Sequence, residues 1–148
     1  MAHRVRTAEE RRSEIQARAA KMGIDEAFIS RLVETFYGHV RRHPKLGPIF
    51  ASEIDDWDEH LPKMKAFWSS VALNSGRYSG KPVPAHQKLS GVEQADFADW
   101  LGLFEQTLHE IAPTPEIVPY FMERAARIAE SLRLAMFSLP QLLDARPR

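Results

Sequence analysis

Two histidines on separate predicted elements are the residues of this chain best suited to chemistry. His60 lies on the apolar side of a predicted helix, one turn before Met64, and histidine is uncommon in such a position. His86 follows Pro82 and Pro84, which are tolerated in a first helical turn and can therefore start a short helix that turns His86 inward, beside Leu89. An inward imidazole is either a hydrogen-bonded core residue or a metal ligand, and spacing alone does not separate the two.

Aromatic residues on other predicted helices can converge with these histidines, namely Tyr37, Phe50, Trp68 and Trp100. The chain has no H-E-x-x-H zinc motif, no phosphate-binding glycine loop, no G-x-S-x-G motif and no cysteine nucleophile. Two neutral imidazoles in an aromatic pocket with few carboxylates form a poor site for a hard cation and a good site for haem iron.

The composition limits the classes of function. The 148 residues suffice for one domain with a substantial core, and 44% hydrophobic with 27% charged residues is typical of soluble proteins. The absence of cysteine excludes disulfides, thiolate zinc sites and iron–sulfur clusters. With 20 basic and 20 acidic residues there is no overall positive field for nucleic acid, and no apolar run approaches 18 residues. We therefore expect a cytoplasmic protein that binds neither nucleic acid nor membrane.

The elements that must position these residues are all predicted to be helices. Thr7 and Glu10 fit a capping box for a helix over 7–21, and Asp25 can cap a strongly amphipathic helix over 26–42. Further helices are expected from about Asp58 to 73, over 93–111, and from Pro115, with Thr114 as N-cap, to about 138. No strand-like alternation occurs, so an all-α fold is predicted.

The connections between these helices are marked by proline and glycine. Residues 44–48 are predicted to form a turn that directs Ile49 and Phe50 into the interior, and residues 74–91 are predicted to be mostly loop around the short His86 helix. His39 and His43 have a spacing that could chelate a metal, but their position beside two arginines favours solvent exposure.

Five pieces of the sequence follow one another in a characteristic order: Val33-Glu34-Thr35-Phe36-Tyr37, Leu46-Gly47-Pro48-Ile49-Phe50, Trp57-Asp58-Glu59-His60 with Phe67-Trp68, Tyr78-x-Gly80-x-Pro82-x-x-x-His86, and Trp100-Leu101-x-Leu103-Phe104-Glu105. In these pieces and their order the chain resembles the third group of truncated haemoglobins over residues 24–137. This resemblance implies a two-over-two helical sandwich over residues 23–140 that holds haem b (iron protoporphyrin IX). Residues 1–22 would then be an N-terminal helical extension and residues 141–148 a tail.

The resemblance also implies roles for individual residues. His86 would be the proximal iron ligand, and Tyr37, His60 and Trp100 would surround a diatomic gas on the distal side. The other expected cofactor contacts are Phe50, Met64, Phe67, Trp68 and Leu89. His60 could act as a gate, as a hydrogen-bond partner of Tyr37 or as a sixth iron ligand.

Hydrogen bonds from Tyr37 and Trp100 to dioxygen would slow its release, which argues against oxygen transport. We therefore expect the protein to carry out redox reactions of dioxygen, nitric oxide or peroxide. The reaction would be nitric oxide dioxygenase-like or peroxidase-like, with a reductase as partner. Carbon monoxide is a further expected ligand. Candidates to pair with the haem propionates are Lys63, Lys65, Arg77, Lys81 and Lys88. The alternative is a helical protein-interaction module without a cofactor, in which the inward histidines and tryptophans are core residues.

Overall fold

The structure, a computed structural model, describes residues 7–78 and 91–138, and within these ranges it contains helices and no strands. The helices are α1 (Ala8–Met22), α2 (Glu26–Arg42), α3 (Leu46–Ala51), α4 (Trp57–Leu73), α6 (Gln94–Ile111) and α7 (Ile117–Arg133), followed by the π-helical segment η1 (Leu134–Ser138). The all-α prediction is confirmed.

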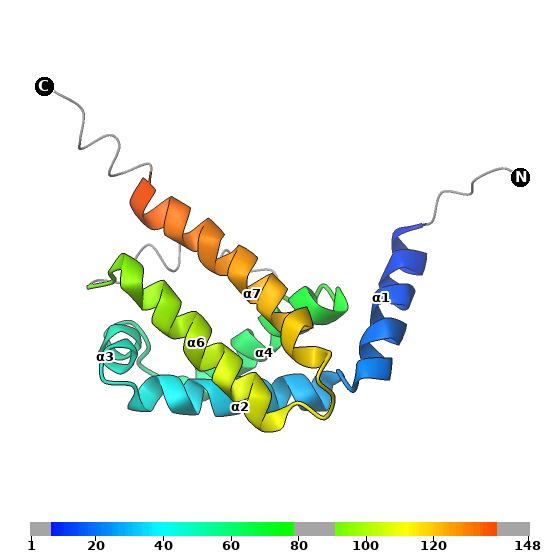
Figure 1. Cartoon of the computed structure of the whole chain (residues 1–148), viewed down its shortest axis with the longest axis horizontal. Helices are drawn as coiled ribbons and strands as arrows, with labels where there is room; N and C mark the ends of the chain where they lie inside the picture. Colours follow the sequence, from blue (N-terminus) through cyan, green and yellow to red (C-terminus); the bar gives the residue numbers. More distant parts are fainter. Residues whose placement is uncertain (1–6, 79–90, 139–148) are drawn as a thin grey trace, which may run out of the picture.

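Two pairs of helices form the body of the molecule. Helix α2 packs against α4, and α6 packs against α7, with which it runs side by side in the opposite direction (Figure 1). The pairs are joined because α2 also contacts α6 and α4 contacts α7, while α3 lies at one end against α2 and α6 (Figure 1). This is a two-over-two helical sandwich.

Helix α2 forms where the hydrophobic periodicity predicted it. The side chain of Asp25 accepts a hydrogen bond of 2.8 Å from the backbone N–H of Phe28 and so caps the helix. The apolar residues recur at spacings of three and four, which places them on one face. All of them are buried: Phe28, Ile29, Leu32, Val33, Phe36, Tyr37 and Val40.

Helix α1 is largely exposed and lies away from α3 and most of α6 (Figure 1). Thr7 caps it by accepting from the backbone N–H of Glu10, as predicted. Its contacts with the body include the fully buried Ala19 and two hydrogen bonds. The Gln16 amide donates to the Leu73 carbonyl at 3.1 Å, and the Thr114 hydroxyl donates to the Met22 carbonyl at 2.7 Å.

Two predicted local features are wrong. Residues 46–48 belong to the short helix α3 and not to a turn; Pro48 fits because it lies in the first turn, where a backbone N–H has no helical partner. Thr114 is not an N-cap, because its hydroxyl bonds to Met22, and α7 begins at Ile117 after Glu116.

Helix α4 begins at Trp57, one residue before the predicted start, with Asp56 as its cap. Pro62 lies inside the helix, where it removes the N–H that would bond to the carbonyl of Asp58. The helix ends at Leu73, and its C-cap Asn74 has a left-handed backbone with φ of 51°. No helix among the described residues combines the length and apolarity needed to cross a membrane.

Candidate functional site

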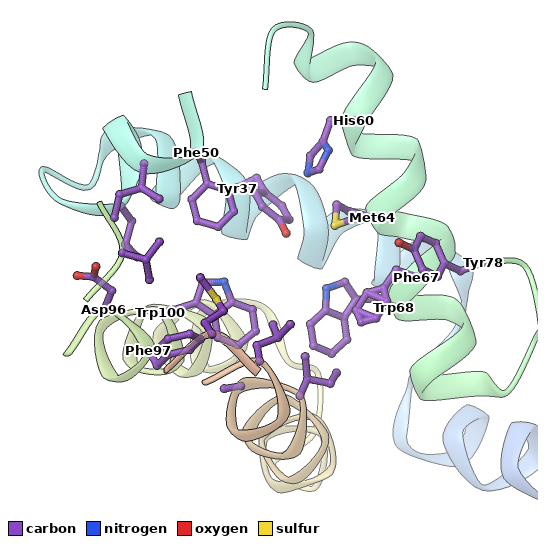
Figure 2. Close-up of a pocket in the computed structure, with 17 residues that line it drawn as sticks. Tyr37, Phe50, His60, Met64, Phe67, Trp68, Tyr78, Asp96, Phe97 and Trp100 are labelled. Carbon is purple, nitrogen blue, oxygen red and sulfur yellow. The ribbon is translucent and has the colours of Figure 1, made fainter. Parts of the chain in front are cut away.

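A large apolar pocket lies between the two helix pairs (Figure 2). Its empty space, part of which is open to solvent, measures about 1020 Å³. Seven of the nine predicted site residues line it: Tyr37, Phe50, His60, Met64, Phe67, Trp68 and Trp100. The other two, His86 and Leu89, lie outside the described residues.

The three residues predicted to surround a bound gas reach the pocket from three helices. Tyr37 comes from α2, His60 from α4 and Trp100 from α6, so that segments distant in the sequence meet at one space (Figure 2). The aromatic rings of Tyr37 and His60 are nearly perpendicular, at 86°, with their centroids 5.8 Å apart. The polar atoms are therefore gathered at a few points of an otherwise apolar wall.

Tyr37 is held by its neighbours and kept neutral by its surroundings. Its ring packs edge-on against Phe36 and Phe50, with centroids 5.1 and 6.1 Å away. Burial raises the pKa of the Tyr37 hydroxyl far above its ordinary value of 10.0, and repulsion by Tyr78 contributes in the same direction. The hydroxyl therefore keeps its proton at neutral pH and can donate a hydrogen bond.

His60 lies one turn before Met64 on α4, and both side chains face the pocket (Figure 2). The Nε2 atom of His60 is buried, although the residue as a whole is only half-buried. The expectation that His60 turns to the interior is confirmed.

A stack of three rings fixes the position of Trp100. Its indole lies parallel to the ring of Phe104, at 5° with centroids 5.5 Å apart, and Trp68 stacks on Phe104 at 4.8 Å and 22°. Phe36 packs edge-on against Trp100 at 5.5 Å. Because Phe104 is fully buried between the two indoles, it sets the positions of both pocket-lining tryptophans.

Helix α3 places Phe50 in the pocket wall, and the start of this helix is capped by His43. The Nδ1 atom of His43 accepts from the backbone N–H groups of Lys45 and Leu46, at 3.1 and 3.0 Å, and thereby satisfies donors at the start of α3. His43 is half-buried, so the prediction that it is exposed to solvent is wrong. It can cap α3 because α3 begins only three residues after it.

His39 also differs from its prediction. Its Nε2 lies 3.0 Å from the Glu110 carboxylate, and its Nδ1 lies 3.0 Å from the guanidinium of Arg42, so it is half-buried between α2 and α6. This contact lowers the pKa of Glu110. His39 and His43 thus bond to different groups and do not form a chelating pair.

Several residues that line the pocket were not predicted as site residues. They are Phe97, Ile128, Leu132 and Met136, together with Leu46, Ile49, Tyr78, Val92, Asp96 and Ala129. The inward faces of α6 and α7 carry most of them, but periodicity does not distinguish a residue in packed core from one beside a cavity.

Asp96 is the one carboxylate among the described lining residues. It is buried at 5% exposure and accepts a hydrogen bond of 2.7 Å from the backbone N–H of Glu93, as part of a capping box that starts α6. Figure 2 shows its carboxylate turned away from the centre of the pocket. Asp96 is therefore a structural carboxylate.

The described candidates for propionate binding each contact a carboxylate of the protein. Lys63 lies 3.5 Å from Glu59, Lys65 lies 3.0 Å from Glu34, and Arg77 lies 3.0 Å from Glu26. All three pairs are at least partly exposed, so they hold these side chains only weakly. Lys81 and Lys88 lie outside the described residues.

Comparison with known proteins relates the chain to one group of globins. It is 35% identical over 118 residues to "Group 3 truncated hemoglobin ctb" of Campylobacter jejuni, and the match covers 77% of this chain and 92% of that protein. The structure matches the crystal structure of the group III truncated haemoglobin from Campylobacter jejuni with a TM-score of 0.72 and 34% identity, again over 77% and 92% of the two chains. No family model matches the sequence.

Proposed function

The chain belongs to the group III truncated haemoglobins, a family of haem-binding globins, and on this premise we propose that its pocket holds haem b and binds dioxygen and other diatomic gases. The observation that carries the proposal is the convergence of Tyr37, His60 and Trp100 on one apolar pocket. When bound, haem would supply an iron that takes up a diatomic gas and exchanges electrons.

The residues of the pocket fit a flat apolar macrocycle. Aromatic side chains cover much of the wall, and Met64 and Met136 add thioethers that adapt to an irregular surface. Phe50, Phe67 and Trp68 would pack on the faces and edges of the ring system. Burial of this apolar area would provide most of the binding free energy.

His86 is our proposed iron ligand. The sequence has no cysteine, so a thiolate ligand is excluded, and neutral imidazole suits haem iron. Among the described residues that line the pocket, His60 carries the only imidazole, and it faces Tyr37. Two imidazoles on separate elements can serve different purposes, with His86 holding the iron and His60 facing the gas.

Tyr37 and Trp100 would donate hydrogen bonds to dioxygen held in the pocket. Each bond contributes about 1 kcal/mol, and somewhat more in surroundings that exclude water. The raised pKa of Tyr37 supports its role, because the hydroxyl remains a donor over the physiological pH range. Together the two groups would retain dioxygen and stabilise negative charge that develops on it.

Strong retention favours consumption of the gas over its delivery. We propose that the protein combines nitric oxide, dioxygen and one electron to nitrate, or uses the same polar groups to reduce peroxide. A reductase would supply the one electron for nitrate formation, or the two electrons for reduction of peroxide to water. Consumption of nitric oxide by the oxygenated protein, compared with the Tyr37→Phe variant, would distinguish these reactions from storage or sensing.

Haem binding is tested by adding haem to the purified protein and recording the absorption spectrum. We expect a strong Soret band and a shifted band in the ferrous carbon monoxide form, both lost or greatly weakened in His86→Ala. The exposed histidine variant His109→Ala is the matched control and should behave as wild type. A wild-type protein without a Soret band would instead support the helical interaction module.

A further inference from the structure

Trp57 contacts both polar residues of the α2–α4 wall without lining the pocket itself. Its ring centroid lies 5.7 Å from that of His60, with the rings perpendicular at 90°, and 5.7 Å from that of Tyr37, at 51°. Since Tyr37 and His60 also contact each other at 5.8 Å, the three rings form a closed triangle. Trp57 therefore lies behind the two side chains that face the ligand space.

Arg41 holds Trp57 from the outer side. Its guanidinium carbon lies 4.9 Å from the centroid of the indole, within the range of a cation–π contact. Arg41 is exposed and Trp57 is half-buried, so the indole separates the polar pair from solvent.

The four side chains connect α2 and α4 through regular helical spacings. Tyr37 and Arg41 are four residues apart on α2, and Trp57 and His60 are three residues apart on α4, so each pair lies on one face of its helix. Each helix thus contributes one residue to the pocket wall, Tyr37 or His60, and one residue that packs behind this wall, Arg41 or Trp57.

The backbone near His60 explains why the packing of Trp57 behind this side chain matters. Pro62 removes one hydrogen bond from the second turn of α4, next to the turn that carries His60. The direction of the imidazole then depends more on side-chain packing, and Trp57 and Tyr37 pack against it on two sides. Loss of Trp57 would leave space into which the imidazole could rotate.

We propose that Trp57, secured by Arg41, is a positioning residue that restricts His60 and Tyr37 to one arrangement toward the ligand. The proposal rests on the function proposed above, because it concerns the polar groups that would meet a bound gas. It predicts that Trp57 controls the number of distinct environments the gas encounters.

The first test needs no haem. In the protein without cofactor, nuclear magnetic resonance couplings across the Cα–Cβ bond of His60 report its rotamers. We expect one rotamer in wild type, averaged couplings in Trp57→Ala, and a single rotamer restored in Trp57→Phe, which keeps an aromatic ring. Averaging already present in wild type, or a single rotamer in Trp57→Ala, would overturn the proposal.

The second test uses the haem-loaded ferrous protein with carbon monoxide, whose infrared stretching bands count the polar environments around the gas. We expect at least one additional band in Trp57→Ala, with about a tenth of the intensity or more, as for a minor conformer that becomes populated. Identical bands in Trp57→Ala and wild type would contradict the proposal. Absence of haem uptake by wild type would contradict only the proposed function, since the haem-free test would still decide the role of Trp57.

Arg41→Met keeps the test decisive if Trp57→Ala fails to fold. It leaves the indole in place and removes only its cationic contact, so we expect the same additional band at lower intensity and partial averaging of the His60 couplings. The matched control is Arg31→Met, an exposed arginine on the same helix, which should match wild type in both measurements. Equal behaviour of the two arginine variants would remove Arg41 from the proposal.

Discussion

The hydroxyl of Ser69 donates a hydrogen bond of 2.8 Å to the carboxylate of Glu26, which joins the buried face of α4 to the first turn of α2. Ser69 is fully buried, and its hydroxyl also lies 2.7 Å from that of Ser75. Glu26 additionally pairs with Arg77 at 3.0 Å. These bonds bring the start of α2, the end of α4 and the segment after α4 into one corner.

Ser69→Ala should lower the free energy of unfolding by about 1–2 kcal/mol, because it removes the buried partner of a charged group. Urea denaturation followed by circular dichroism measures the change. Ser13→Ala, on the exposed face of α1, is the control and should leave the stability nearly unchanged. Equal stabilities of the two variants would show that the Ser69–Glu26 bond contributes nothing.

Gly47→Ala should destabilise the protein by about 1–3 kcal/mol. A Cβ at Gly47 would lie 2.8 Å from the backbone carbonyl oxygen of Arg41, and that oxygen cannot move away as a flexible side chain could. The same substitution at Gly102, in the middle of α6, meets no atom within 4 Å. Gly102→Ala should therefore stabilise by up to about 1 kcal/mol, the ordinary gain in helix propensity.

This pair of glycine variants also tests the coupling of α3 to the pocket. A shift of α3 in Gly47→Ala would move Phe50, so haem affinity should fall in this variant and stay unchanged in Gly102→Ala. Titration of the two variants with haem, at a temperature where both are folded, measures the difference.

Tyr37 should remain protonated in the folded protein when the pH rises above 10. Burial raises its pKa in the folded state, whereas the unfolded chain has the ordinary value of 10.0. The unfolded state therefore loses this proton first, and the contribution of Tyr37 to stability, complete below pH 10, decreases as the pH rises above it. The decrease approaches about 1.4 kcal/mol per pH unit while only the unfolded state is ionised.

The measurement compares wild type with Tyr37→Phe. The phenolate absorbance of the two folded proteins should not differ well above pH 10, and the difference should appear on unfolding. In parallel, wild type should lose stability relative to Tyr37→Phe as the pH increases from 10. A Tyr37 phenolate band in the folded protein near pH 10 would show that the hydroxyl is not buried as described.

Tyr37→Phe and Trp100→Phe should each release dioxygen faster. Loss of one hydrogen bond of about 1 kcal/mol corresponds to a factor of about five in the dissociation rate, and more if the site excludes water. Stopped-flow mixing of the oxygenated protein with carbon monoxide measures this rate. Phe97→Leu, which changes the apolar wall without removing a donor, is the control. Unchanged dissociation in both donor variants would remove the hydrogen-bond argument for retention.

The sequence by itself determined most of the helices and pointed to most residues of the candidate site. The stripe from Phe28 to Val40 and the caps at Thr7 and Asp25 depend on residues three or four positions apart, so their effect can be read locally. Tyr37, His60 and Trp100 could be predicted as inward-facing, polar and on separate helices, and the order of motifs indicated the globin group to which the comparisons assign the chain.

The tertiary structure decided which of these inward residues share a cavity and which partners they have. His43 caps α3, Thr114 bonds to Met22, and Trp57 lies between Arg41 and the Tyr37–His60 pair, because segments distant in the sequence meet there. Periodicity fixes the face of a helix on which a residue lies. It does not fix which other helix that face meets, since that depends on how all the apolar faces are buried together.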